Sequence, residues 1–449
     1  MATDSSNGSR ILSIETLPGK GRAYVATKDI TAGTVIHIAE PLATAVSQEW
    51  IPETCMWCFD FGYPKKQKVK IVDTPIEMQA LYQEWEQYKN QEHCRISKRN
   101  VKKEDMRIYK NMLFCSETCR EKFKKSGDHS NNPSLMEWKL ILAMNMKLDQ
   151  EYKDTMKIEP NLITTAASTT TMTCQPLEGN DQWIDANDDS LLLAWLDTAW
   201  SCLTKDSGIY KEIDDADRTM CRLIAACIIK KYVEEETSNK AQLQNMSLGF
   251  KDLLLIQDNE LSFFRSCFPK TLQRLPPLTQ LDSASRKSLL LSFLPIEIKD
   301  VMALYCFFQR ALSNSSLENI PALKNVDHPL FRTIYFREKA NSFGLWELSD
   351  RGQDIDNGGV TDDLELLGWG IYPSAVYFNH SCDANVKKVR DGRNIKFIAR
   401  RPIEQGEEAC ISYGSIEESV NERRSRLLEH YYFLCQCTRC LKETISEPQ

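Results

Sequence analysis

Three cysteines near the carboxyl-terminal end, arranged as Cys435-x-Cys437-x-x-Cys440, constrain the fold more than any other feature of the sequence. A structural zinc ion takes four tetrahedral ligands, so these three thiolates need a fourth ligand from elsewhere in the chain. Cys382, at the end of Asn379-His380-Ser381-Cys382, is the obvious candidate. A zinc ion bound in this way would build one site from two distant segments.

A candidate catalytic tyrosine lies between those two segments. Tyr413 belongs to Ile411-Ser412-Tyr413-Gly414, which ends a strand-like run. Taken alone, Tyr413 would be interpreted first as an aromatic core residue at a strand end. Its setting after Glu407-Glu408 and before the final three cysteines favours a functional position. A Cys382–His380 nucleophilic pair is a weaker alternative, because zinc ligation would use the same thiolate.

Composition narrows the class of protein. A chain of 449 residues with 42% hydrophobic content is long enough for about two to four globular domains. The 16 cysteines include short C-x₂-C, C-x₃-C and C-x-C groups, which favour metal binding in a reducing compartment over a disulfide framework. Others, such as Cys221, Cys227, Cys267 and Cys306, have mostly apolar neighbours and are expected in the core.

Net charge and hydropathy argue against nucleic acid and membranes as partners. Asp and Glu number 63 against 56 Lys and Arg, and the formal charge of -7 argues against general nucleic-acid binding. The sequence has neither a signal-peptide pattern at its start nor an uninterrupted apolar run of about 18 residues, so we expect no membrane partner. We therefore expect a soluble intracellular protein in the nucleus, the cytoplasm or both.

The pattern of short segments predicts strands at both ends of the chain and helices between them. Glycine-containing turns separate strand-like runs at 11–14, 23–26, 34–38, 386–389, 395–399 and 408–413. Helical patterns occupy 78–88, 191–200 and 298–312, and Met220, Leu223, Ile224, Cys227 and Ile228 form the stripe of an amphipathic helix. A basic run at 98–110 reads as a solvated face, and 160–190 reads as a flexible loop.

The ordered motifs resemble the SET- and MYND-domain (SMYD-like) protein lysine methyltransferases, over most of the chain. The motifs that carry this resemblance are Gly19-Lys20-Gly21-Arg22, Asn341-Ser342-Phe343, Leu367-Gly368-x-Gly370, Asn379-His380-Ser381-Cys382-Asp383-Ala384-Asn385, Glu407-Glu408 with Ile411-Ser412-Tyr413, and the three final cysteines. Ala384 stands where the family has proline.

The resemblance implies a cofactor and the residues that bind it. The cofactor is S-adenosyl-L-methionine, which transfers a methyl group to the ε-amine of a lysine in a histone or another protein. Tyr413 and Tyr431 are implied as catalytic residues, with Tyr431 lining the lysine channel. The implied cofactor contacts are Lys20, Gly21, Arg22, Asn341, Phe343, Phe378, Asn379, His380, Tyr413 and Phe433.

The resemblance also implies a zinc finger, from which this sequence departs. Cys55, Cys58, Cys115 and Cys119 match the ligands of the first MYND zinc ion. For a second finger zinc ion only His93, Cys94 and His129 are available, so we expect one zinc ion there and about two in the chain. The sequence ends at Gln449, and the family's carboxyl-terminal helical-repeat domain is therefore expected to be missing.

These observations predict an α+β fold in which insertions interrupt a β-rich SET domain. The expected order is the amino-terminal part of the SET domain at 1–50, a MYND-like zinc finger at 51–140, a helical insertion at 141–335, the catalytic part of the SET domain at 336–414, and a zinc-binding post-SET segment at 415–449. The expected activity is lysine methylation. An inactive scaffold that binds a partner protein through the zinc finger is the alternative.

Overall fold

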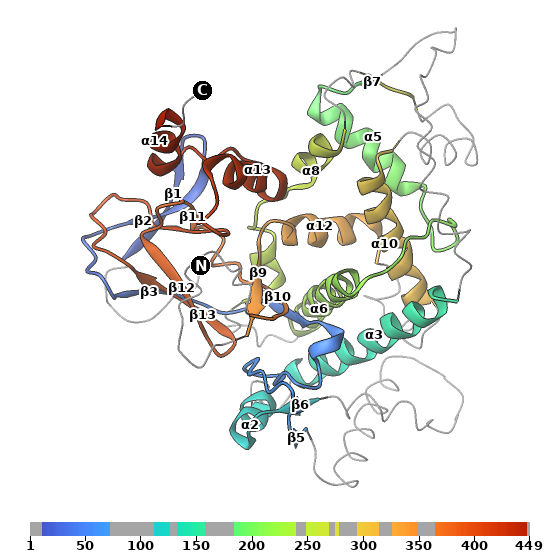
Figure 1. The fold of residues 1–449 in the computed structure, drawn as a ribbon. Coiled ribbons are helices and arrows are strands. Elements are labelled where there is room, and N and C mark those ends of the chain that lie inside the picture. Colours follow the sequence, from blue (N-terminus) through green and yellow to red (C-terminus); the bar gives the residue numbers. More distant parts are fainter. Residues whose placement is uncertain are drawn as a thin grey trace. The chain divides into compact units, whose positions relative to one another are not determined.

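The computed structural model describes residues 11–71, 112–125, 133–157, 184–238, 248–268, 274–277, 294–313, 326–347 and 364–446 (Figure 1). The predicted helix at 78–88, the basic run at 98–110 and the residues His93, Cys94 and His129 lie outside these ranges. So does most of the predicted loop at 160–190. At the end of that loop the prediction is wrong, because strand β7 (Ile184–Asp185) and the start of helix α5 (Asp189–Ser201) lie within it.

The chain divides into two compact units, each formed from separate stretches of sequence. Unit 1 comprises Met1–Trp138, Lys230–Gln257 and Glu338–Gln449, and unit 2 comprises Lys139–Ile229 and Asp258–Arg337. Both ends of the chain thus contribute to unit 1, which contains nearly all the strands and both cysteine groups.

Strands from the two ends of the sequence pair with one another in unit 1. Its sheets are a β1–β2 hairpin, the three-stranded sheets β4-β10-β9 and β12-β13-β3, and the pairs β11-β14 and β5-β6. The strand bounds are β1 (Leu12–Leu17), β2 (Gly21–Ala26), β3 (Val35–Ala39), β4 (Ala43–Val46), β5 (Val69–Lys70), β6 (Leu113–Phe114), β9 (Ser342–Trp346), β10 (Leu366–Ile371), β11 (Asn379–His380), β12 (Val386–Asp391), β13 (Asn394–Ala399) and β14 (Cys410–Ile411).

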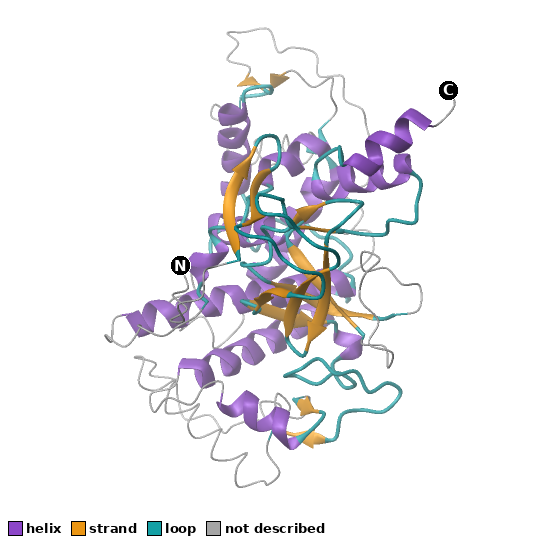
Figure 2. Ribbon diagram, turned by 90° about the vertical axis from the view of Figure 1, so that its left-hand side faces the viewer, coloured by secondary structure: helices purple, strands orange, loops and turns teal. Residues whose placement is uncertain are grey.

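Most of the predicted strands are confirmed, with one that is too long. The strands expected at 11–14, 23–26, 34–38, 386–389 and 395–399 correspond to β1, β2, β3, β12 and β13. The run at 408–413 forms only the two-residue strand β14, because Glu408 makes a single bridge to Val25 and the chain bends at Tyr413 and Gly414. Figure 2 shows how loops join these short strands.

The glycine motif of β10 has a packing explanation. Gly368 has a φ of +152°, and a Cβ atom at this position would lie 2.0 Å from the carbonyl oxygen of Ala45 in β4. The backbones of β10 and β4 therefore approach too closely for any side chain at residue 368.

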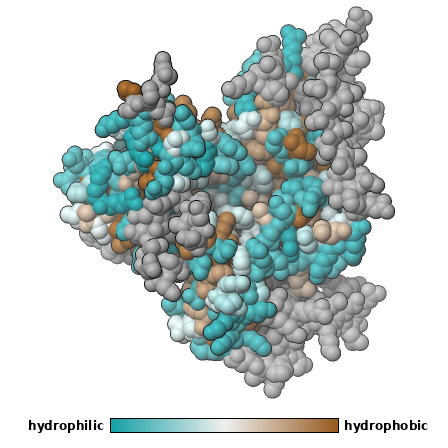
Figure 3. Space-filling view, viewed as in Figure 1, coloured by the Kyte–Doolittle hydropathy of each residue, from teal (hydrophilic) through white to brown (hydrophobic). Residues whose placement is uncertain are grey.

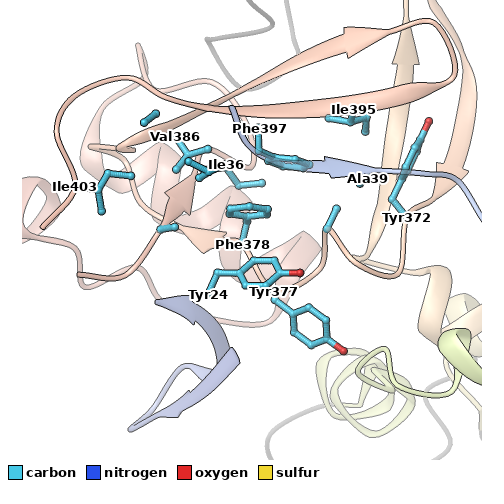
Figure 4. Packing of buried hydrophobic residues seen from close by; sticks show 14 of the residues in the cluster. Tyr24, Ile36, Ala39, Tyr372, Tyr377, Phe378, Val386, Ile395, Phe397 and Ile403 are labelled. Carbon is cyan, nitrogen blue, oxygen red and sulfur yellow. The ribbon is translucent and has the colours of Figure 1, made fainter. Parts of the chain in front are cut away.

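Aromatic rings form the core of unit 1 beneath the β12-β13-β3 sheet. The rings of Phe378 and Phe397 stack at 4.2 Å, and that of Tyr24 lies 4.7 Å from Phe378 (Figure 4). All three are at least 92% buried, since their exposed fractions are 0%, 0% and 8%. Such stacked, fully buried rings favour a rigid framework around the segment that leads to Asn379.

Helices complete unit 1. They are the 3₁₀ helix η1 (Gln48–Trp50), α2 (Glu117–Lys125), α7 (Phe250–Leu253), α13 (Val420–Tyr431) and α14 (Thr438–Ser446). Helix α13 begins with a capping box in which the Ser419 hydroxyl accepts from the backbone N–H of Glu422, and the Glu422 carboxylate accepts from that of Ser419.

Unit 2 is mainly helical. Besides α5 and β7, its elements are α8 (Glu260–Cys267), β8 (Arg274–Leu275), α10 (Ile296–Ser313) and most of α12 (His328–Glu338), and it shares α3 (Pro133–Thr155) and α6 (Asp215–Ser238) with unit 1. The helices predicted at 191–200 and 298–312 are confirmed by α5 and α10.

The prediction of an amphipathic helix with one solvent-facing side is wrong for the middle of α6. Every residue from Leu223 to Ile229 is buried, so this stretch has no solvent-facing side. The alanines Ala225 and Ala226 hid this in the sequence, because they fit a solvent-facing or a buried position equally well. Among the cysteines expected in the core, Cys221, Cys227 and Cys306 are buried, whereas Cys267 is half-buried.

The described surface is mostly hydrophilic in the view of Figure 3, with hydrophobic side chains scattered over it. Among the described helices, none combines the length and the apolar character that crossing a bilayer requires.

Candidate functional site

The first component of the site is a cluster of four thiols. Cys382, Cys435, Cys437 and Cys440 bring their Sγ atoms within 4.8 Å of one another. The Cys382 Sγ lies 4.0 Å from that of Cys435 and 3.5 Å from that of Cys440. Four sulfurs bound tetrahedrally at about 2.3 Å from zinc would lie about 3.8 Å apart, whereas a disulfide needs about 2.05 Å. The cluster therefore fits zinc.

The second cluster has the same geometry. The Sγ atoms of Cys55, Cys58, Cys115 and Cys119 also lie within 4.8 Å of one another. That of Cys58 is 3.6 Å from those of Cys115 and Cys119, which are themselves 3.5 Å apart. Both predicted ligand sets are thus brought together as groups that could bind a metal ion.

The second cluster, of Cys55, Cys58, Cys115 and Cys119, is attached to the hairpin formed by β12 and β13. The guanidinium of Arg390, in β12, donates to the carbonyl oxygens of Cys58 at 2.9 Å and Phe59 at 3.1 Å. Arg393, in the turn of the hairpin, lies over the ring of Trp57 at 4.7 Å. Because Arg390 is only 6% exposed, these bonds form in a site largely shielded from water.

The parallel pairing of β11 with β14 brings Asn379-His380 beside the segment that leads to Tyr413. The amide of Ser381 donates to the Ile411 carbonyl at 2.9 Å and extends this contact. The Tyr413 hydroxyl donates to the Phe378 carbonyl at 2.9 Å. Burial raises the pKa of Tyr413, so its phenol is protonated at neutral pH.

Two further aromatic residues enclose Tyr413. The Tyr431 hydroxyl donates to the Tyr413 carbonyl at 3.1 Å, and the two ring centroids are 4.8 Å apart. Phe433 presents its ring edge-on to that of Tyr413 at 6.3 Å. Burial also raises the pKa of Tyr431. The two predicted catalytic residues, Tyr413 and Tyr431, therefore lie together, with the predicted cofactor contact Phe433 beside them.

His380 is buried between Tyr413 and the cysteines. Its Nδ1 accepts from the backbone N–H of Tyr413 at 3.1 Å, and its Nε2 is 3.2 Å from the Sγ of Cys382. Burial lowers the pKa of His380 to about 4, so the imidazole is neutral at neutral pH. Both ring nitrogens are engaged within the protein, which argues against His380 as a general base.

Glu408 joins two of the predicted cofactor residues, Lys20 and Asn379, a position that was not predicted. Its carboxylate accepts from the ammonium of Lys20 at 2.5 Å and from the amide of Asn379 at 2.9 Å. The Glu408 side chain is 14% exposed and that of Lys20 is 53% exposed. The acidic pair before Ile411 was the only sequence signal for it.

Asn385 is a second residue that sequence reasoning did not single out. Its side-chain oxygen accepts from the Cys410 amide at 2.8 Å, and its side-chain nitrogen donates to the Glu408 carbonyl at 2.9 Å. The buried Asn385 thereby fixes the backbone on both sides of residue 409 and supports β14 from the end of the Asn379–Asn385 motif.

Other predicted cofactor residues lie around this centre. Gly21 has a φ of +75° at the start of β2. The guanidinium of Arg22 lies 5.1 Å from the ring of Tyr377 and donates to the carbonyl of Leu255, while the Asn341 side chain donates to the carbonyl of Gln257 at 3.3 Å.

Arg22 and Asn341 thus both contact a short segment after α7 that the sequence did not mark. Phe343 connects to the aromatic core through Phe397, with ring centroids 6.4 Å apart.

Comparison with known proteins agrees with this geometry. The SET domain family model matches residues 21–414. The chain is 23% identical over 429 residues to the "Potential protein lysine methyltransferase SET6" of Saccharomyces cerevisiae, covering 94% of this chain and 93% of the relative.

Two other relatives match over shorter stretches. A SET and MYND domain-containing protein of Dictyostelium discoideum is 36% identical over 111 residues, 25% of this chain and 24% of the relative. The histone-lysine N-methyltransferase SMYD3 of Homo sapiens is 41% identical over 78 residues, 17% of this chain and 18% of the relative.

Proposed function

This chain belongs to the SET domain family and is a protein lysine methyltransferase of the SMYD-like type, and we propose that S-adenosyl-L-methionine is its methyl donor. The observation that carries the proposal is the position of Tyr413. It lies between Asn379-His380 and the rings of Tyr431 and Phe433, next to a four-cysteine cluster.

The reaction needs alignment more than acid–base catalysis. S-adenosylmethionine supplies a methyl group on a sulfonium. The neutral amine of the substrate lysine forms the new N–C bond as the C–S bond of the donor breaks, and the proton from its ammonium passes to water beforehand. The protein must therefore orient this amine and exclude water around it.

Tyr413 has the properties of the orienting group. Its hydroxyl donates its one hydrogen to the Phe378 carbonyl, and the hydroxyl oxygen can still accept a hydrogen bond from the substrate amine. Since burial raises its pKa, the phenol would stay neutral throughout and act by positioning, without removing the proton. We propose that Tyr431 lines the lysine channel beside it.

We propose that the cofactor's amino-acid end lies near Lys20 and Asn379, which Glu408 holds together. The remaining contacts are proposed for Gly21, Arg22, Asn341, Phe343, Phe378, His380 and Phe433. The two cysteine clusters would each hold a structural zinc ion, since all four ligands are thiolates and none is left open for substrate.

The substrate is proposed to be a protein with an accessible lysine, in the nucleus or the cytoplasm. The Cys55 to Cys119 finger is proposed as a surface for a partner protein. We expect no direct contact with nucleic acid, in keeping with the net charge of -7.

Calorimetry of S-adenosylmethionine binding to the zinc-loaded protein tests the cofactor first. Transfer of a radiolabelled methyl group to proteins of a cell extract then tests the reaction. Tyr413→Phe should bind cofactor but lose transfer by about 100-fold or more, because the amine loses its acceptor. Tyr63→Phe, at a residue that is 65% exposed, serves as the control. No cofactor binding by the folded protein would refute the proposal.

A further inference from the structure

We propose that the His380 side chain is a positioning residue that couples the Cys382 cluster to Tyr413. The inference rests on the proposed function of Tyr413 as the residue that orients the substrate amine. It assigns to the imidazole a role separate from any cofactor contact of the His380 backbone.

The tautomer of His380 follows from its hydrogen bonds. Its Nδ1 lies 3.1 Å from the backbone nitrogen of Tyr413, which can only donate, so Nδ1 must be the acceptor and carries no proton. A ring whose Nδ1 accepts a hydrogen bond is not an imidazolium, so its one N–H group is on Nε2. That nitrogen is 3.2 Å from the Sγ of Cys382. The Nε2–H therefore donates to the sulfur.

Water competes little with these two hydrogen bonds. His380 is 7% exposed and Cys382 is 2% exposed, so water has little access to either. Among the described residues, no other hydrogen-bond partner contacts Nε2 or the Tyr413 amide. The ring also packs on that of Tyr413, with centroids 5.4 Å apart. Position and orientation of the imidazole are thus fixed from both sides.

The chemistry of the cluster explains why a donor belongs there. Four thiolates around one zinc ion carry a net charge of about −2, and N–H donors to the sulfurs offset it and orient the ligands. Arg423, which is 1% exposed, supplies a second donor, since its guanidinium lies 3.6 Å from the Sγ of Cys440. Of these two donors, His380 is the one that also contacts Tyr413.

Loss of the metal ion from the Cys382 cluster should therefore alter the position of Tyr413, because the His380 imidazole contacts both. If Cys382 loses the metal ion and moves, the ring loses the contact that orients Nδ1, and the Tyr413 amide loses its acceptor. Cofactor binding through Lys20 and Asn379 uses other contacts, so its affinity should change less than the rate of methyl transfer.

Long-range ¹H–¹⁵N NMR of the zinc-loaded full-length protein tests the tautomer without any activity. We expect the proton of His380 on Nε2, with Nδ1 unprotonated. A proton on Nδ1 would overturn the proposal. This readout stands even if no methyl transfer is found, so it separates failure of the coupling from failure of the proposed function.

Two substitutions then test the hydrogen bonds of His380 to Cys382 and to Tyr413 one at a time. His380→Gln can retain a donor near the Nε2 position, and His380→Asn can retain an acceptor near the Nδ1 position. We expect the asparagine variant to release zinc to a chelator about tenfold faster than the glutamine variant.

We expect the glutamine variant to lower kcat by about tenfold while changing the Kd of S-adenosylmethionine by less than about threefold. Equal zinc release from both variants would contradict the donor to Cys382. A kcat unchanged in both variants, or a Kd that rises as much as kcat falls, would contradict the coupling to Tyr413.

Discussion

The carboxylate of Glu408 and the ammonium of Lys20 lie 2.5 Å apart, although 388 positions separate them in the sequence. The same carboxylate accepts from the side chain of Asn379 at 2.9 Å. One acidic residue thus holds together two residues that we propose as cofactor contacts, one from the start of the chain and one from the end.

Glu408→Gln should weaken cofactor binding with little effect on folding. Glutamine keeps an acceptor for Asn379 but loses the charge that pairs with Lys20. Because Lys20 is 53% exposed, the pair contributes only about 1 kcal/mol, so we expect the Kd of S-adenosylmethionine to rise about fivefold. Calorimetry measures it. Glu407→Gln, which breaks the exposed pair with Arg401, is the control and should leave the Kd unchanged.

Arg390→Met should release the zinc finger from the β12–β13 hairpin. The substitution leaves the Cys58 and Phe59 carbonyl oxygens without their donor in a buried site, at a cost of about 2–4 kcal/mol. The melting temperature should fall, and the Cys55 cluster should lose zinc to a chelator faster than the Cys382 cluster. Lys396→Met, which removes a more exposed pair with Asp391, should do neither.

Cys437→Ser should lower the zinc content from about two ions per chain to about one, because it removes one of four ligands. Methyl transfer should fall with it, since Phe433 and Tyr431 immediately precede this cluster. Metal analysis and an activity assay measure the two effects. Cys267→Ser, outside both clusters, should retain both ions and full activity; loss of zinc there as well would contradict the assignment.

Lys388→Met should stabilise the protein at neutral pH. Lys388 pairs with the buried Phe397 across the β12–β13 ladder, and its amine lies 5.8 Å from the Phe343 ring. Burial lowers its pKa from 10.5 to about 8. Below pH 8 the amine is protonated in both states, and the folded state bears the full cost of burying the charge. We expect the variant to gain about 1–3 kcal/mol at pH 7.

The pH dependence of the free energy of unfolding is a second test of the burial of Lys388. Between about pH 8 and 10.5 the unfolded chain keeps the proton that the folded chain has lost, so wild-type stability should rise with pH through this window. Lys388→Met should lack that rise, whereas Lys387→Met, one position along the strand, should retain it. Denaturant unfolding at pH 7 and pH 10 compares them, and an equal rise in all three proteins would rule out burial of Lys388.

Metal-ligand spacing made the cysteine clusters predictable, and Tyr413 followed from its place between Cys382 and Cys435 in the sequence. Glu408, Asn385 and the contacts of Arg22 with Leu255 were not predictable, because polar partners far apart in sequence depend on strand register and loop paths that no local pattern encodes. The burial of residues 223–229 of α6 on all sides was hidden for a related reason, since alanine is compatible with either environment. Helix positions came from local periodicity, and long-range pairings came only from the structure.

Tyr413 is tethered at both of its ends to one three-residue stretch. Its hydroxyl donates to the carbonyl of Phe378, and its backbone N–H donates to the ring of His380. A phenol held in this way cannot tilt or slide on its own, so a displacement of residues 378–380 carries the whole tyrosine along with it. Tyr413, which we propose to orient the substrate amine, therefore moves together with Asn379, which we propose to contact the cofactor. Mutations in the aromatic core beneath them should alter the positions of the amine and of the cofactor together.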